Sequence, residues 1–201
     1  MRNVILPALC VTAALAIPST ALANDGKHAR YAAQLGFSPF GGSLNFSFNK
    51  NKKNTLTVAL GGSPTVGFLT LDIDGTKYDV ESSTSYIGAF WNHRPFKEAD
   101  WFRFNVGLAA GQISNTLTQA NDANTVYTAN YRQAPVGYMG VGFGNQVKEG
   151  FLIGFDMGVL STAGPDVLPV KGSGADTQAI SDSFMFGPIL PNGQLTVGWG
   201  W

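Results

Sequence analysis

The stretch Leu195-Thr196-Val197-Gly198-Trp199-Gly200-Trp201 alternates strictly between large apolar and small residues. Side chains on a β-strand point to opposite faces in turn, so this segment is predicted to be a strand whose four apolar side chains share one face. A soluble domain seldom ends on an exposed tryptophan, because apolar area in water is unfavourable. A strand that faces lipid carries such a ring readily at the membrane interface. The segment therefore favours a β-strand embedded in a membrane.

Residues 1–23 have the pattern of a secretory signal peptide: a positive start, an apolar run over residues 4–17 and the cleavage site Ala21-Leu22-Ala23. The alternative is a membrane anchor. The apolar run is shorter than the ~20 residues that a spanning helix needs, and it contains Pro7. We therefore expect cleavage after residue 23 and a single mature domain over residues 24–201.

The composition of the mature chain fits an exported β-barrel. Charged residues make up 13% of the sequence, about half the usual ~25% of a soluble domain. Glycine and aromatic residues are abundant, and the cysteine count falls to zero once the signal peptide is removed. Twelve basic residues (thirteen less Arg2) stand against thirteen acidic ones, so the net charge is near −1. No basic patch suggests nucleic acid as a partner.

Short alternating segments recur along the chain, as expected for the strands of a membrane barrel. In the clearest of them, Phe104 and Val106 are predicted to face lipid, and Arg103 and Asn105 the barrel interior. Asp74-Gly75 is a hairpin signal between alternating flanks. The predicted strands lie near residues 31–37, 43–49, 55–73, 77–92, 102–109, 138–144, 151–159 and 195–201. The first two are separate if residues 38–42 form a turn, and the alternative is one long bent strand.

Short turns and long connections alternate along the chain. Polar turns are predicted at residues 50–53, 96–100 and 147–149. We interpret residues 117–130 and 163–190 as long loops, the second with a helical turn near residues 177–182. Counting back from a periplasmic C-terminus places every short turn in the periplasm and every long loop outside, as in bacterial barrels, which have an even number of strands. This consistency predicts an all-β fold, an antiparallel up-and-down transmembrane β-barrel with eight strands.

The pattern resembles that of small outer-membrane β-barrel proteins of Gram-negative bacteria, of the size of OmpA-like barrels. The matching segments are residues 85–96, 134–145 and 154–159, together with the aromatic end. The chain departs from that group by ending on tryptophan, where phenylalanine is usual, and by carrying Pro191-Asn192-Gly193, which looks like an insertion in the last loop.

The resemblance implies a monomeric barrel in the outer membrane that contacts outer-membrane lipid. It also implies that Trp199 and Trp201 form the signal by which the barrel-assembly machinery recognises the chain.

Three functional classes remain open on the sequence. The leading hypothesis is a structural or surface-interaction role through the extracellular loops. The second is a small passive pore for ions or small solutes, because glycines at 140, 142, 144, 154 and 158 would line the interior. An eight-stranded barrel is just wide enough to be filled by side chains, so we interpret these glycines as making room for Tyr138 and Arg103. Arg103 and Asp156 are expected to join an internal polar network with Tyr138, because an unpaired buried charge is very costly.

The third class is an enzyme that modifies outer-membrane lipid. Such chemistry needs a nucleophilic serine near a histidine that a carboxylate orients. The residue types are present in Ser82, Ser83 or Ser85 with His93 and Glu81. His93 lies eight residues from Ser85, or ~26 Å along a strand. Two histidines give no metal-ligand spacing, and no phosphate-binding loop follows a strand. We therefore expect no enzymatic activity, cofactor or metal.

Overall fold

The computed structural model describes residues 27–131 and 135–201, apart from the side chain of Phe68. The predicted signal peptide lies outside the described residues and stays a prediction. The described elements are β1 (Tyr31–Ser38), β2 (Gly41–Asn49), β3 (Asn54–Ile73), β4 (Thr76–His93), β5 (Phe102–Gln119), β6 (Asp122–Tyr131), β7 (Val136–Gly144), β8 (Gly150–Ser161), β9 (Pro165–Lys171), α2 (Thr177–Asp182) and β10 (Ile189–Gly200). Within this part of the chain, no helix is long and apolar enough to cross a membrane.

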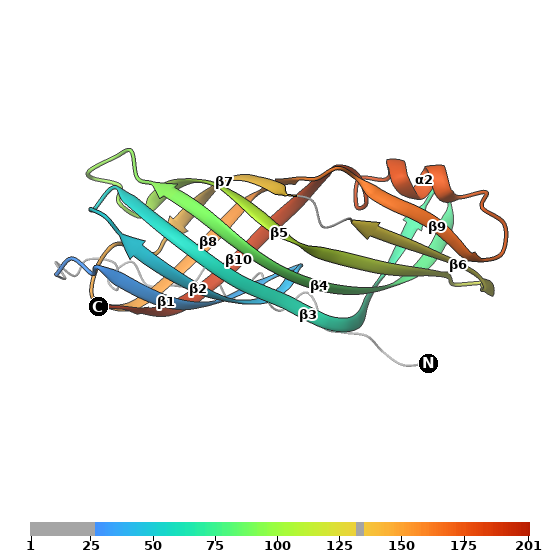
Figure 1. Cartoon of the computed structure of the whole chain (residues 1–201), viewed down its shortest axis with the longest axis horizontal. Helices are drawn as coiled ribbons and strands as arrows, with labels where there is room; N and C mark the ends of the chain where they lie inside the picture. The colour runs from blue at the N-terminus through green and yellow to red at the C-terminus, as the bar shows by residue number, and fades with distance from the viewer. Residues whose placement is uncertain (1–26, 132–134) are drawn as a thin grey trace.

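Eight strands close into an antiparallel ring in the order β1-β2-β3-β4-β5-β7-β8-β10, and β10 pairs back onto β1 (Figure 1). The predicted all-β barrel with eight strands is confirmed. Where the ring is closed, each strand pairs with a neighbour on both sides, so its backbone donors and acceptors bond to adjacent strands. The remaining two strands, β6 and β9, lie outside the ring and continue the sheet from β5.

Side chains along β5 alternate between the outer surface and the interior. Phe104, Val106 and Leu108 point outward and are 47%, 40% and 64% exposed. Arg103 and Asn105 point inward and are each 3% exposed. The predicted faces of this strand are confirmed, and they follow from the two-residue period of a strand whose two sides meet different surroundings.

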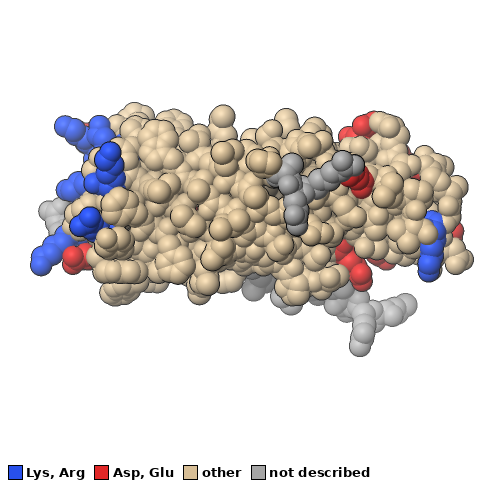
Figure 2. Space-filling model, in the orientation of Figure 1, with Lys and Arg blue, Asp and Glu red and all other residues tan. Residues whose placement is uncertain are grey.

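Aromatic side chains gather at the end of the barrel that carries the C-terminus. They are Tyr31, Phe48, Trp91, Phe96, Trp101, Phe151, Trp199 and Trp201, and their exposed fractions range from 39% to 63%. We call this set the aromatic girdle. Figure 2 shows Lys and Arg gathered beyond it, most Asp and Glu near the other end, and a band between the two ends that carries neither. Rings at the edge of an uncharged band are typical of a membrane–water interface.

Residues 31–49 form two strands joined by a tight turn at Pro39 and Phe40, as the eight-strand count requires. Gly41 follows the turn with φ +98°, and a Cβ there would collide with the backbone of Gly62, so the turn needs glycine. The alternation of apolar residues also changes phase near Pro64. There β3 stays continuous, while its pairing with β4 slips between Ser63 and Val66.

The two long loops predicted from the sequence are wrong in part. Residues 117–130 form a hairpin of β5 and β6, and residues 163–190 contain β9, which pairs with β6. The helix predicted over residues 177–182 is present as α2. Pro191-Asn192-Gly193 is no loop insertion but part of β10, where it pairs only with β8, an edge position that tolerates proline.

The ends of β3, β4 and β5 continue beyond the ring and form a sheet with β6 and β9, which α2 packs against (Figure 1). We call this part the outer extension. Its own apolar core consists of Ile73, Tyr78, Val80, Leu117, Tyr127, Ala129, Ile180 and Phe186. The sequence of β6 resembles a loop because Thr128 and Asn130 occupy outward positions. Its inward side chains, Tyr127 and Ala129, pack in the core of the outer extension rather than in the barrel.

We predict that Val106→Arg lowers the free energy of unfolding in lipid vesicles by ~1–4 kcal/mol, because a charged side chain on the lipid face is destabilising, most of all near the bilayer midplane. Val106→Leu is the matched control and should change little, because the outward side chain stays apolar. Urea unfolding of the refolded protein measures both. Equal stability of the two variants would show that Val106 does not face hydrocarbon.

Candidate functional site

A buried ion pair occupies the barrel interior. Arg103 on β5 donates from Nη2 to both carboxylate oxygens of Asp156 on β8, each at 2.7 Å. Its Nη1 donates to the carbonyl of Gly144 at 2.8 Å, and Asn105 donates a further hydrogen bond to Asp156. The carboxylate therefore has a counter-charge and neutral donors, which is the condition under which two buried charges are tolerated.

A glycine between the partners makes the ion pair possible. Gly142 on β7 lies in register with Arg103 on one side and with Asp156 on the other. A Cβ at this position would collide with the Asp156 carboxylate and with the Arg103 guanidinium. Gly142 therefore leaves room for the Arg103 side chain, as the sequence-based interpretation of the interior glycines expects.

Tyr138 lies over two further glycines, Gly140 and Gly158. Asn105, Gly140, Gly158 and Asn192 form one row across β5, β7, β8 and β10. A Cβ on Gly140 or Gly158 would lie 2.6 or 2.8 Å from the Tyr138 hydroxyl. The ring of Tyr138 meets Phe90 edge to face, with centroids 5.6 Å apart.

The three predicted network residues are thus neighbours, but Tyr138 does not join the hydrogen bonds of the ion pair. Within the described part of the chain, the Tyr138 hydroxyl and the side-chain oxygens of Asn105 and Asn192 are buried without a hydrogen-bond partner. Buried polar atoms in this situation commonly bind water.

The sequence did not reveal a second network near the C-terminal end of the interior. Arg94, just after β4, is 3% exposed and donates to the hydroxyl of Thr55 at 3.0 Å and to the carbonyl of Asn145 at 2.6 Å. The Asn145 side chain accepts from Gln34 and donates to Thr196, both at 2.6 Å. Arg94 and Asn145 lie just after strands, and Gln34 and Thr196 are inward positions of β1 and β10. Their shared burial becomes visible only in the closed ring.

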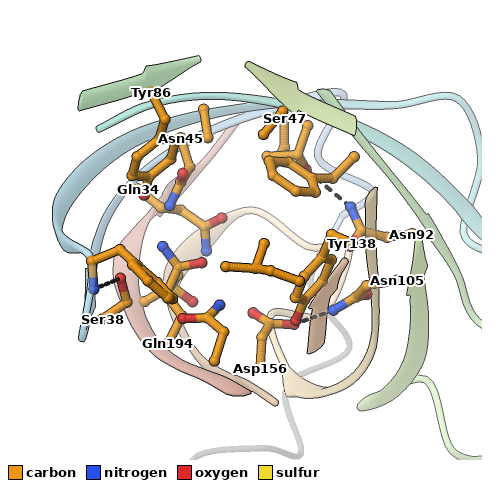
Figure 3. A pocket seen from close by; sticks show the side chains of 18 of the residues that line it. Gln34, Ser38, Asn45, Ser47, Tyr86, Asn92, Asn105, Tyr138, Asp156 and Gln194 are labelled. Carbon is orange, nitrogen blue, oxygen red and sulfur yellow. Dashed lines mark hydrogen bonds between the residues drawn. The ribbon is translucent and has the colours of Figure 1, made fainter. Parts of the chain in front are cut away.

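A cavity of about 150 Å³ remains between these networks. Figure 3 shows polar side chains from several strands directed into it, among them Gln34, Asn45, Ser47, Asn92, Asn105 and Gln194. The volume is below the ~300–1,000 Å³ of typical small-molecule pockets. The interior therefore keeps only a small polar space between its side chains.

The serines and histidine weighed for catalysis do not come together. Nδ1 of His93 lies 2.8 Å from Oδ1 of Asn54, and its ring packs against Trp91. Ser82 and Ser85 lie farther along β4, where they pair with residues of β3 and β5. The described residues contain no group of three or more His, Asp or Glu side chains that could hold a metal ion.

The outer extension has a polar anchor of its own. Asp176 accepts hydrogen bonds from the hydroxyls of Tyr78 at 2.7 Å and Tyr127 at 3.2 Å. The Tyr127 hydroxyl also contacts the carbonyl of Ser173 at 2.7 Å. Burial raises the pKa of the Tyr127 phenol, so the ring stays protonated and able to donate at neutral pH. The anchor fixes the segment before α2 onto the sheet.

Comparison with solved structures identifies the fold. CarO2 of Acinetobacter baumannii aligns with a TM-score of 0.69 and 16% identity over 89% of this chain and 100% of that chain. CarO of the same organism aligns with a TM-score of 0.65 and 15% identity over 85% of this chain and 97% of that chain. Ail, the attachment invasion locus protein of Yersinia pestis, aligns with a TM-score of only 0.39 and 10% identity over 85% of this chain and 93% of that chain. No protein-family model and no curated protein matches the chain. The chain has the fold of small outer-membrane β-barrel proteins.

We predict that Arg103→Met lowers the free energy of unfolding by about 3–5 kcal/mol, because it leaves the Asp156 carboxylate buried without a counter-charge. Adding Asp156→Asn should recover part of the loss, since the remaining amide is neutral. Urea unfolding in vesicles measures the single and double variants. A double variant less stable than Arg103→Met would contradict the pairing.

Gly142→Ala should cost about 1–3 kcal/mol, because its Cβ would displace both members of the ion pair. Gly137→Ala on the same strand is the matched control: its Cβ would meet only Ser161 Cβ, at an ordinary 3.8 Å. Thermal and urea unfolding should separate the two variants. If both match the parent protein, the ion pair does not occupy the space beside Gly142.

Proposed function

We propose that the protein resides in the outer membrane of a Gram-negative cell and has a structural or surface-interaction role through its outer extension. The uncharged band, the aromatic girdle and the fold similarity support the location. They also favour Trp199 and Trp201 as the element that the barrel-assembly machinery recognises, and a monomer whose outer wall contacts lipid.

The outer extension carries this proposal. Two strands and a helix are added to the ring at one end, with a separate core and the Asp176 anchor to hold them. Barrel closure requires none of these elements. The extension also presents large apolar side chains to solvent, namely Leu168, Val170, Phe184 and Met185, of which Phe184 is 75% exposed. Apolar groups held on a rigid platform in water are typical of interaction surfaces.

A passive pore is the second candidate, and the polar interior cavity is the observation that favours it. The ion pair, Tyr138 and the Arg94 network fill much of the cross-section, which favours a closed interior. A lipid-modifying activity receives no support from His93, whose ring nitrogen is engaged with Asn54. We therefore propose that the protein is not an enzyme.

Single cysteines and bilayer recordings test the proposal together. The mature chain has no cysteine, so Ala175→Cys in the outer extension and Lys52→Cys in the β2–β3 turn each provide one label site. In intact cells, a membrane-impermeant maleimide should label Ala175→Cys at once and Lys52→Cys only after permeabilisation. Purified protein in planar bilayers should show no stable openings, because its interior is filled.

Fractionation, cysteine labelling and bilayer recording can each contradict a different part of the proposal. Recovery of a soluble periplasmic protein would reject the membrane location, and labelling of Lys52→Cys in intact cells would reverse the orientation. Reproducible openings of one size would favour the passive pore over the surface role.

A further inference from the structure

We propose that the outer wall of β1, β2 and β10 binds one anionic glycerophospholipid at the C-terminal end of the barrel. Its phosphate would lie at a basic patch beside the aromatic girdle, and one acyl chain would lie in a hollow around Ala33. The inference rests on the proposed membrane location and adds a specific lipid site to it.

The basic patch consists of Lys27, Arg30, Lys50, Lys52 and Lys53, all of which are exposed. The Asn49 amide donates to the Arg30 carbonyl at 2.9 Å, so the segment before β1 lies beside the β2–β3 turn. The sequence has no Asp or Glu from residue 26 to residue 71. Five cations therefore gather on one side of this end. The exposed Glu149 lies beside them, since its amide donates to the Lys27 carbonyl at 2.9 Å, and the patch keeps a positive excess.

Arg30 connects the patch to the aromatic girdle. Its guanidinium carbon lies 5.7 Å from the ring centroids of both Tyr31 and Phe48. The ring of Tyr31 in turn lies 6.5 Å from that of Trp201. A guanidinium held over two rings at the membrane interface keeps its donors at the level of the head groups, where a phosphate accepts them.

The hollow begins two residues farther along β1, ~7 Å from Tyr31 along the strand. Ala33 pairs with Phe46 of β2 and with Trp199 of β10, so a small side chain stands between two large ones. The hollow is lined by Ala33, Leu35, Leu44, Phe46, Phe151 and Val197. An acyl chain that enters the hydrocarbon beside Arg30 would meet this apolar hollow first.

Charge identifies the lipid class. The other side of the same end mixes signs, since Lys97 is followed by Glu98 and Asp100. Exposed acids dominate the outer extension, with Asp72, Asp74, Asp79, Glu81, Asp122 and Asp182 against Lys77 and Lys171. Only the basic patch attracts a net negative head group, and the adjoining hollow requires that the head group carry acyl chains. An anionic phospholipid satisfies both conditions.

The test is native mass spectrometry of the folded, exported protein in detergent. The probes are phosphatidylglycerol and phosphatidylcholine with identical chains, and separately a phosphorylated, acylated disaccharide. The parent protein should bind one phosphatidylglycerol in preference to phosphatidylcholine, and added salt should reduce that preference. Arg30→Gln with Lys50→Gln should weaken phosphatidylglycerol binding about 25-fold, since each basic side chain near a charged head group contributes about fivefold.

Two matched controls locate the site. Lys97→Gln removes a cation from the same end and should keep the preference. Ala33→Phe fills the hollow and should weaken the binding of both phospholipids. Ala89→Phe makes the same change on the outer face of β4 and should weaken neither.

Several results would overturn the assignment. Equal binding of the two phospholipids would remove the anionic site, and an equal effect of Lys97→Gln would reduce it to a diffuse charge effect. Preference for the acylated disaccharide would reject a glycerophospholipid. If the Arg30/Lys50 variant does not fold, the parent protein still tests the lipid site. A preference for phosphatidylglycerol that does not change with salt would contradict this site without affecting the proposed membrane location. Failure to insert into phosphatidylcholine vesicles would instead reject the membrane location.

Discussion

The pairing of the last strand with the first is the constraint on which the rest of the structure depends. Tyr31 and Trp201 exchange two backbone hydrogen bonds of 2.9 Å, and the ladder continues from Ala32 to Phe37. Inside a hydrocarbon layer no water would satisfy these groups, so an open sheet would leave a row of unpaired amides. Closure also fixes which side chains face inward, because one residue of slip in this seam would turn Trp199 into the interior.

A ring of eight strands leaves a narrow interior, and the residues within it are matched in size. Tyr138 and the ion pair of Arg103 with Asp156 are large, and each lies over glycine on a neighbouring strand. Most polar groups in this interior have protein partners, because the guanidinium, the carboxylate and several amides hydrogen-bond to one another. The same residues that make the barrel polar inside also occupy space within it.

Period-two alternation made the ring predictable, since the ring portions of β5 and β8 carry large apolar side chains at most outward positions and polar or small ones at most inward positions. The approach of Arg103 to Asp156 followed from two opposite charges on inward positions. β6 was missed although Tyr127, Ala129 and Tyr131 alternate, because Thr and Asn on its other face imitate a loop. The Arg94 network was beyond sequence reasoning, since its members meet only through ring closure. The hollow at Ala33 depends likewise on which strands pair.

The free edge of the outer extension has a consequence for how the protein behaves in a crowd of identical molecules. Strand β9 ends the sheet, and an unpaired strand edge is a template on which another chain could add. Two of its seven residues, Pro165 and Pro169, have no amide hydrogen to offer. Proline on such an edge interrupts the donor row that strand addition requires. The two prolines thus make β9 a poor template for the addition of a strand from a neighbouring molecule.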